Sequence, residues 1–318
     1  MSKTSNKLLK ALLFIGTAAG AVYCFNQWIN DFSTAKNKLR TKKGDYYEWK
    51  YGNVYYQKSG SGDPILLIHD YSHCSSSYEW KNVVDSLSET NTVYTIDLLG
   101  CGRSEKPQIT YTNFLYVQLI TDFIQDVIGE KTTIISSGFS SSFAIMAAAY
   151  NKLAVNKLVL VNPVEMDNLT KECTTSYRIF KDVLELPLIG TFIYNLLTTK
   201  TKIDNDLTEN YIYNPFNITS DMIDTYYEAA HLGKGNGKFV LSSYLGNYLN
   251  ANIAHGLKSI SNEILVILGG DETYLESVVD VYKELNENVH SVTIPKTKRI
   301  PHLEKSELFI AELNAILN

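Results

Sequence analysis

One serine stands where a strand gives way to a helix, and it is the residue in this chain best placed to act as a nucleophile. Residues 132–135 are β-branched and predict a buried strand, and an alanine-rich segment that follows predicts a helix. Gly138-Phe139-Ser140-Ser141-Ser142 lies between them. A sharp turn of this kind exposes a serine hydroxyl at the edge of a sheet, and its usual pattern is G-x-S-x-G. Ser140 takes the serine position, and Ser142 replaces the last glycine.

Beyond this turn, the chain alternates between predicted strands and predicted helices. Unbroken apolar runs at 65–68, 93–98 and 158–161 are typical of strands that are covered on both faces. Residues 77–87 and 117–128 have the apolar spacing of amphipathic helices. This alternation implies right-handed crossovers and a mostly parallel sheet flanked by helices. The sequence therefore predicts an α/β fold.

Four motifs of the chain resemble the α/β-hydrolase superfamily in their order and spacing: PILLIHDY, YTIDLLGCGRSEKP, SGFSSSF and KLVLVNP. The likeness runs from about Gly44 to the C-terminus and is closest to the capped branch that holds esterases, haloalkane dehalogenases and epoxide hydrolases. It implies an α/β-hydrolase fold with a helical cap. In that branch the glycines of DLLGCGRS shape a turn. The pattern G-x-G-x-x-G is not completed, which argues against a dinucleotide loop.

The resemblance also implies how Ser140 would be assisted. The oxyanion would be held by the backbone N–H groups of Tyr71 and Ser141. The acid would follow the strand that ends near residue 268, as Asp271 or Glu272, with Glu165 as a second candidate position. Asp70 stands where the family usually has glycine. We expect its carboxylate to face solvent or to cap the following turn, because an inward carboxylate would place negative charge beside a developing anion.

The general base is the main departure from the family. Relatives usually read G-H-x-P-H-x-E before the closing helix, whereas this chain reads Lys298-Arg299-Ile300-Pro301-His302-Leu303-Glu304. Arg299 therefore occupies the base position, and a guanidinium cannot accept the serine proton. His302 matches the second histidine and lies about one helical turn too late to be a good substitute base. Arg299 could instead pair with Asp271 or Glu272, or bind an anionic ligand.

Strand signals fade after residue 163 and helical signals replace them up to about residue 260. The resemblance implies that residues 164–260 form a helical cap between two parts of the hydrolase core, residues 44–163 and 261–318. The cap is rich in tyrosine, which suggests a small ester or another amphipathic, lipid-like ligand. Tyrosine packing explains the same composition equally well.

The N-terminal 30 residues predict a membrane anchor. Residues 11–25 are apolar apart from Thr17, and Trp28 could lie at the membrane interface. A cleaved signal peptide with Ala19-Gly20-Ala21 as its cleavage site is the rival interpretation. We expect a single-pass anchor followed by a polar linker at residues 31–43. Lysines flank the segment on both sides, so the sequence leaves open which side of the membrane carries the domain.

Composition limits the classes of partner. The 318 residues carry a net charge of −5, which provides no basic field for nucleic acid. The four cysteines share no close spacing, so a zinc site or dithiol centre is not predicted. We expect no metal and no cofactor, and the oligomeric state stays open.

Two functions fit these observations. The first is a membrane-anchored serine hydrolase that cleaves an ester or thioester through Ser140, weakened by Arg299 at the base position. The second is a hydrolase-fold pseudoenzyme that binds a small ligand or a protein partner under its cap. Asp70, Ser142 and Arg299 are three departures within one site, and they motivate the second hypothesis.

Overall fold

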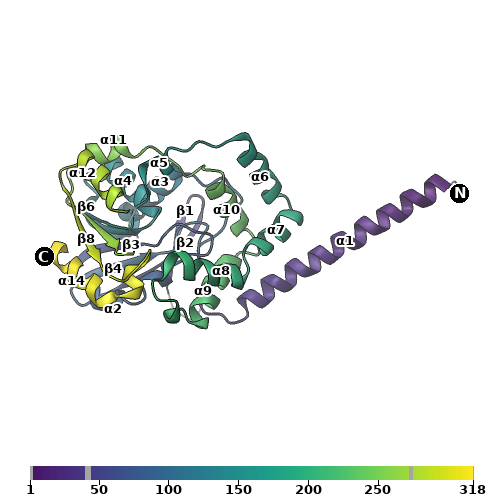
Figure 1. Cartoon of the computed structure of the whole chain (residues 1–318), viewed down its shortest axis with the longest axis horizontal. Helices are drawn as coiled ribbons and strands as arrows, with labels where there is room; N and C mark the ends of the chain where they lie inside the picture. Colours follow the sequence, from purple (N-terminus) through teal and green to yellow (C-terminus); the bar gives the residue numbers. More distant parts are fainter. Residues whose placement is uncertain (1–2, 40–43, 272–274, 318) are drawn as a thin grey trace.

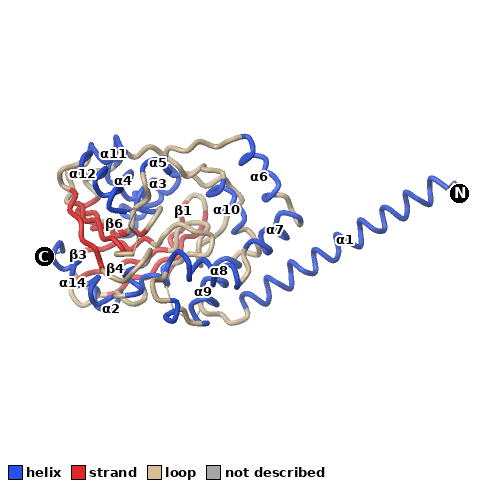
Figure 2. The backbone as a smooth tube through the Cα atoms, viewed as in Figure 1, coloured by secondary structure: helices blue, strands red, loops and turns tan. Residues whose placement is uncertain are grey.

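One eight-stranded sheet organises the protein in a computed structural model that describes residues 3–39, 44–271 and 275–317. The strand order is β1-β2-β4-β3-β5-β6-β7-β8, parallel from β4 to β8 and antiparallel where β2 meets β1 and β4. Figure 2 shows helices on both sides of the sheet, which confirms the predicted α/β architecture. The strands are β1 (Asp45–Trp49), β2 (Gly52–Ser59), β3 (Asp63–Ile68), β4 (Asn91–Ile96), β5 (Thr132–Ser137), β6 (Val155–Val161), β7 (Ile264–Gly269) and β8 (Val289–Ile294).

The central strands are apolar on both faces, as their sequence predicts. Along β3, Leu66 and Ile68 join one buried cluster, whereas Ile65 and Leu67 join the cluster on the opposite face. Successive side chains of a strand point to opposite faces, so an unbroken apolar run fills both layers at once. Each layer of helices therefore packs on its own apolar surface of the sheet.

The helices beside the sheet follow the predicted order with one difference. The segment predicted as one helix at 77–87 is a 3-10 turn, η1 (Ser77–Trp80), and a short helix, α2 (Val84–Leu87). Trp80 and Leu87 are buried nevertheless. The other elements beside the sheet are α3 (Asn113–Phe123), η2 (Ile124–Ile128), α4 (Ser140–Tyr150), α12 (Leu275–Leu285), α13 (Pro301–Glu304) and α14 (Ser306–Leu317).

The glycine-rich turn after β4 is held by a buried ion pair. Asp97 accepts hydrogen bonds from the Arg103 backbone N–H (2.8 Å) and from Arg103 Nε (2.7 Å). A Cβ atom at Gly102 would lie 2.4 Å from Asp97 Oδ2, so only glycine fits this close approach. Burial alone would raise the pKa of Asp97, but the neighbouring Arg103 charge outweighs it and lowers that pKa. The motif thus has a structural role here.

Residues 164–260, called the insertion below, form helices between β6 and β7. Figure 1 shows most of them gathered at one side of the sheet. Tyr211, Tyr226 and Tyr227 of the insertion pack with Ile300 and Leu303 of the C-terminal part. The elements are α5 (Met166–Leu169), α6 (Thr175–Glu185), α7 (Ile189–Leu197), α8 (Lys200–Asp206), η3 (Leu207–Tyr211), η4 (Pro215–Asn217), α9 (Ser220–His231), α10 (Gly237–Leu245) and α11 (Ala254–Ser259).

A single long helix, α1 (Lys3–Thr34), leaves the domain on the side of the insertion (Figure 1). Residues Leu12–Thr34 are long and apolar enough to cross a membrane, by length and composition. The helix continues past residue 30, where the anchor was expected to end. The predicted linker at 31–43 therefore begins as helix, and its residues 40–43 lie outside the described part of the chain. Just before that gap, the backbone N–H groups of Lys38 and Leu39 donate to Glu228 of α9.

Candidate functional site

The turn between β5 and α4 differs in register from the expected one. Its left-handed residue is Gly138 (φ +54°), and Ser140 is already the first residue of α4. The Ser140 side chain is fully buried, and its hydroxyl donates to the backbone carbonyl of His69 at 2.7 Å. The left-handed residue of the turn thus lies two positions before the serine that the motif suggested.

The Asp70 side chain points into the protein, which contradicts the expectation that it faces solvent or caps the next turn. It is fully buried, and its Oδ1 accepts a hydrogen bond from the Phe139 backbone N–H at 2.8 Å. A Cβ atom at Gly138 would lie 2.1 Å from that same oxygen. The carboxylate therefore fills the space that any side chain at position 138 would need, and the Phe139 N–H gives the physical reason for its inward orientation.

Arg299 supplies the opposite charge. Its Nε lies 3.2 Å from Asp70 Oδ2, and its guanidinium carbon lies 5.1 Å from the ring centre of Tyr211. The Tyr211 hydroxyl also contacts Asp70 Oδ2 at 3.4 Å. The two residues that depart from the family pattern at the oxyanion turn and at the base position thus form one ion pair, in which the carboxylate is buried and the guanidinium is partly exposed.

Asn162 at the end of β6 fixes the loop that carries Arg299. Its Nδ2 donates to the carbonyls of Lys298 (3.0 Å) and Arg299 (2.9 Å), while its Oδ1 accepts from the Gly269 N–H (2.8 Å). The ends of β6 and β7 and the loop after β8 are therefore joined through one side chain. This bridge holds the guanidinium above the carboxyl ends of the strands, where ligands of α/β sheets bind.

Of the two acids expected after β7, only Asp271 lies among the described residues. Asp271 is exposed, and its backbone N–H donates to the Thr297 carbonyl at 3.0 Å. Glu272 lies outside the described residues. Glu165 borders a cavity next to Arg299, and its Oε2 accepts a hydrogen bond from Asn168 at 2.9 Å. Among the described residues, Asp70 is the acid whose ion pair with Arg299 is seen at this site.

Tyr71 and Ser141, whose N–H groups were expected to hold the oxyanion, and the neighbouring Ser142 all contact other parts of the protein. The Ser141 N–H donates to the Gly138 carbonyl at 3.2 Å, within the first turn of the helix. Tyr71 is buried, and its ring stacks edge-on against Tyr116 with 5.2 Å between ring centres. Ser142 Oγ donates to the Phe139 carbonyl at 2.9 Å.

The imidazoles near the site have other partners. His302 is fully buried and stacks on Trp80 at 4.0 Å, and burial lowers its pKa to about 3. His69 Nδ1 donates to the Asp70 carbonyl (2.7 Å), and its Nε2 accepts from the Leu98 N–H (3.0 Å). Burial also lowers the pKa of His69. Within the described residues, the Ser140 hydroxyl therefore has a carbonyl and not an imidazole as its acceptor.

Glu79 is a buried acid of this site that sequence reasoning missed. Its Oε2 accepts from the Asp70 backbone N–H at 3.0 Å, and its Oε1 lies 3.4 Å from the Tyr226 hydroxyl. Burial, followed by the negative charge of Asp70, raises the pKa of Glu79 to about 8. A carboxylate between two aromatic residues, shortly after His69-Asp70, is the sequence signal that could have revealed it.

Arg299 borders two cavities. The smaller, of about 220 Å³, lies toward the insertion. The larger, of about 550 Å³, also reaches Phe139 and Glu165. With 30% of its side chain exposed, Arg299 can be reached from these cavities, whereas Asp70 cannot. The smaller cavity is lined by Tyr71, Ser72, His73, Asp206, Tyr211, Leu241, Tyr244, Leu245 and Arg299.

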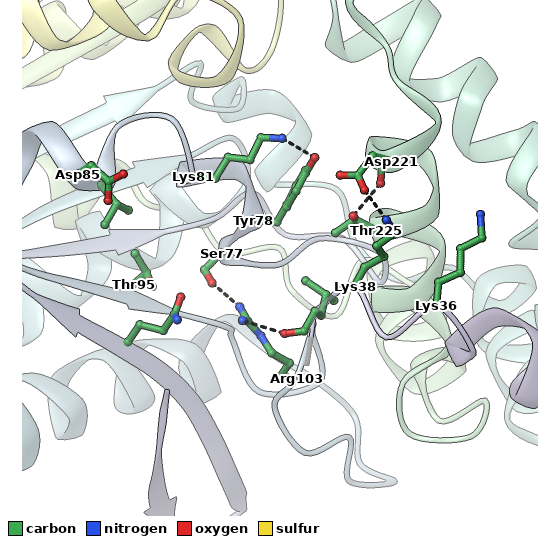
Figure 3. Close-up of a pocket in the computed structure, with 13 residues that line it drawn as sticks. Lys36, Lys38, Ser77, Tyr78, Lys81, Asp85, Thr95, Arg103, Asp221 and Thr225 are labelled. Atoms are coloured by element: carbon green, nitrogen blue, oxygen red, sulfur yellow. Dashed lines mark hydrogen bonds and ion pairs between the residues drawn. The ribbon is translucent and has the colours of Figure 1, made fainter. Parts of the chain in front are cut away.

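A third cavity, of about 490 Å³, lies apart from this site between α9, η1 and residues 36–39 (Figure 3). Several of its charged side chains already have polar partners. Arg103 contacts Ser77 (2.7 Å), Lys81 contacts the Tyr78 hydroxyl (2.5 Å), and Lys38 contacts Asp221 (2.6 Å). In the part of the chain that the structure describes, no three His, Cys, Asp or Glu side chains come together as a metal site.

Comparison with known proteins gives the family. Residues 65–312 match the model of the Alpha/beta hydrolase family. The chain belongs to this family. It is 30% identical over 111 residues to a soluble epoxide hydrolase of Corynebacterium sp. (strain C12), a match that covers 35% of this chain and 38% of that protein. The match to 2-hydroxy-6-oxo-6-(2'-aminophenyl)hexa-2,4-dienoic acid hydrolase of Metapseudomonas resinovorans is 30% over 108 residues, covering 33% and 37%. The chain thus aligns with little more than a third of the length of these relatives.

Solved structures share the fold over most of the chain. A serine hydrolase involved in carbazole degradation superposes with a TM-score of 0.70 and 19% identity, covering 86% of this chain and 98% of that one. A membrane phospholipase A superposes with a TM-score of 0.68 and 18% identity, covering 98% of both chains. The predicted α/β-hydrolase fold is confirmed.

Proposed function

We propose that this protein is a membrane-associated member of the α/β hydrolase family that binds a small ligand beneath its insertion without hydrolysing it. The observation that carries the proposal is the position of the Asp70 carboxylate, which accepts the Phe139 N–H and pairs with Arg299. In the nucleophile turn of the family, the serine lies on the strained residue, and the N–H of the next residue serves the oxyanion. Gly138 and Phe139 hold those two positions here.

The nucleophile, the oxyanion donor and the base that hydrolysis requires are each missing or have another partner here. Gly138 has no side chain to attack a substrate, and the Phe139 N–H already binds an anion. Arg299 at the base position stays protonated and holds that anion in place. Removing a triad member costs most of the rate enhancement of a serine hydrolase, so these combined changes support a binding function.

The smaller cavity supports a ligand with an anionic or polar group. The Arg299 guanidinium and the rings of Tyr211 and Tyr244 line this cavity. Guanidinium groups bind carboxylates with two parallel hydrogen bonds, and aromatic rings contact the apolar part of a small molecule. A ligand carboxylate could share Arg299 with Asp70 without entering the turn at Gly138.

A serine hydrolase acting through Ser140 is the second candidate, and family membership favours it. The relatives named above include an epoxide hydrolase, a dienoic acid hydrolase and a phospholipase. In this alternative Ser140 would have to leave the His69 carbonyl, with Asp271 or Glu272 as the acid, His302 as a substitute base, and the N–H groups of Tyr71 and Ser141 as oxyanion donors.

Labelling with a fluorophosphonate probe separates the two candidates. We expect the wild-type chain to stay unlabelled and to hydrolyse p-nitrophenyl esters no faster than Ser140→Ala. Labelling that Ser140→Ala abolishes would overturn the proposal. The triple variant Asp70→Gly, Gly138→Ser, Arg299→His restores a nucleophile at the strained position, and labelling of this variant would further support the assignment of Gly138.

Membrane anchoring through α1 belongs to the same proposal. We expect the full chain to remain in the membrane fraction after extraction with alkaline carbonate, because Leu12–Thr34 is long enough to span a bilayer. A uniform shift in mass of the mature protein to that of a chain lacking the first 20 or so residues would instead indicate cleavage of a signal peptide.

A further inference from the structure

Two helices of the insertion expose an apolar stripe. On α6, Ile179 and Val183 are 59% and 38% exposed, and Leu186 and Ile189 continue the stripe into the start of α7 at 45% and 55%. The spacing of four residues places Ile179 and Val183 on one face of α6, and Leu186 directly follows the end of this helix. The opposite face of α6 is buried through Leu184. We call Ile179, Val183, Leu186 and Ile189 the α6–α7 stripe.

The α6–α7 stripe lies next to the last turns of α1. Phe25 packs edge-on against Phe192 of α7 with 5.3 Å between ring centres. Asn26 Nδ2 donates to the Leu188 carbonyl at 3.0 Å, at the junction of α6 and α7. The stripe is therefore at the level along α1 where the apolar helix meets the folded domain.

The last turns of α1 have their polar residues on the inside. Asn26 and Asn30 are buried against the insertion, whereas Trp28 and Phe32 are 58% and 53% exposed. A helix that packs on a water-soluble domain normally shows the reverse arrangement. Outward tryptophan and phenylalanine beside inward asparagine are typical of a helix surrounded by lipid at the membrane interface.

The number of residues that a membrane span needs also places this part of α1 near the membrane interface. A helix needs about 20 residues to cross the hydrocarbon core, so a span that begins near Leu12 ends near Asp31. Phe25 and Asn26 then lie inside the bilayer or at its surface. The parts of the insertion that touch them, Leu188 and Phe192, cannot be far from the same depth.

We infer that the α6–α7 stripe rests in the membrane interface, so that the insertion docks on the lipid surface beside α1. This inference rests on the proposed anchoring by α1. The polar residues at the stripe, exposed Arg178 and Asp182, balance in charge, so apolar contact and not attraction to anionic lipid drives the docking. Zwitterionic phosphatidylcholine is therefore a sufficient partner. The larger cavity beside Arg299 also reaches Tyr177 at the start of α6, which places its rim near the lipid.

The test is cross-linking of the full chain in vesicles of phosphatidylcholine that carry a photoreactive group on the acyl chain, with peptides mapped by mass spectrometry. We expect adducts on α1 and on peptides that contain Ile179, Val183 and Ile189. Leu153 and Phe216 are the matched control, because they are 86% and 96% exposed and lie outside the stripe. The double variant Val183→Asp, Ile189→Asp should lose adducts on α6 several-fold while keeping those on α1, and Leu153→Asp should change neither.

The outcomes distinguish docking from anchoring. Adducts on α1 without adducts on the stripe would overturn the docking and leave the anchor standing. Absence of adducts on α1 would overturn the anchor and the docking together. Cross-links between two chains at the stripe, in place of lipid adducts, would identify the surface as a self-association interface and would also overturn the inference.

Discussion

Two aspartate–arginine pairs, each with a buried carboxylate, follow neighbouring strands of this sheet, and they differ in how they are built. Asp97 and Arg103 belong to one turn after β4, with Nε–Oδ2 and Nη2–Oδ1 distances of 2.7 and 3.0 Å. Asp70 and Arg299 are far apart in the sequence, and Arg299 Nε lies 3.2 Å from Asp70 Oδ2. The side chain of Arg103 is 6% exposed, whereas that of Arg299 is 30% exposed. The Asp97–Arg103 pair, called the closed pair below, stabilises a turn. The Asp70–Arg299 pair, called the open pair below, lies at a site that a ligand can still reach.

The largest effect is expected at the closed pair. Asp97→Asn removes the charge that holds Arg103 and weakens the acceptor of the Ser77 N–H. It should destabilise the protein by about 3–5 kcal/mol, because a buried guanidinium is left without a counter-charge. Urea unfolding of the full chain in detergent measures this loss. A loss below that of the Arg299 variant described next would reverse the comparison of the two pairs.

The open pair should contribute less. Arg299→Gln should cost about 1–3 kcal/mol, because Asp70 loses its ion pair but keeps the Phe139 N–H as a donor. Adding Asp70→Asn should recover part of this loss, since the double variant leaves no unpaired charge. Unfolding of both single variants and the double variant gives the coupling energy. Strictly additive losses would show that the contact does not stabilise the fold.

The last prediction concerns the dependence of stability on pH near the open pair. The pKa of Glu79 is about 8 in the fold against 4.5 without it. The folded state therefore binds more protons between these values, and the contribution of Glu79 to stability falls as pH rises from 4.5 to 8. The stability of Glu79→Gln relative to wild type should rise over the same interval and level off above it. Unfolding at several pH values checks this, and a difference that is constant with pH would contradict it.

The fold could be predicted from the sequence because its signals are local and repeated. Runs such as residues 65–68 specify strands covered on both faces, and the order of motifs specifies the family. The strands and the helical segments of the insertion each have a signal within a few neighbouring residues.

The site could be predicted only in part, because its geometry depends on distant residues. Two overlapping patterns, centred on Gly138 and on Ser140, fit the same small-residue turn, and only the backbone tells which residue is strained. The direction of the Asp70 side chain depends on Arg299, far along the chain. The sequence identified both residues as departures from the family, but it did not reveal that they pair with each other. Glu79 has only a weak sequence signal, and its role at the site follows from its burial and its contact with the Asp70 N–H.

The close approach at Gly138 also limits how this protein could change by single substitutions. A Cβ atom there would lie 2.1 Å from Asp70 Oδ1, so a serine at position 138 requires the Asp70 carboxylate to move away from the Phe139 N–H. Replacing Asp70 first leaves Arg299 without its counter-ion. A serine at position 138 or the loss of Asp70, each taken alone, therefore disturbs this site, although the completed set of changes need not. Because of the Asp70–Arg299 ion pair, a return to hydrolysis would require at least two coordinated mutations.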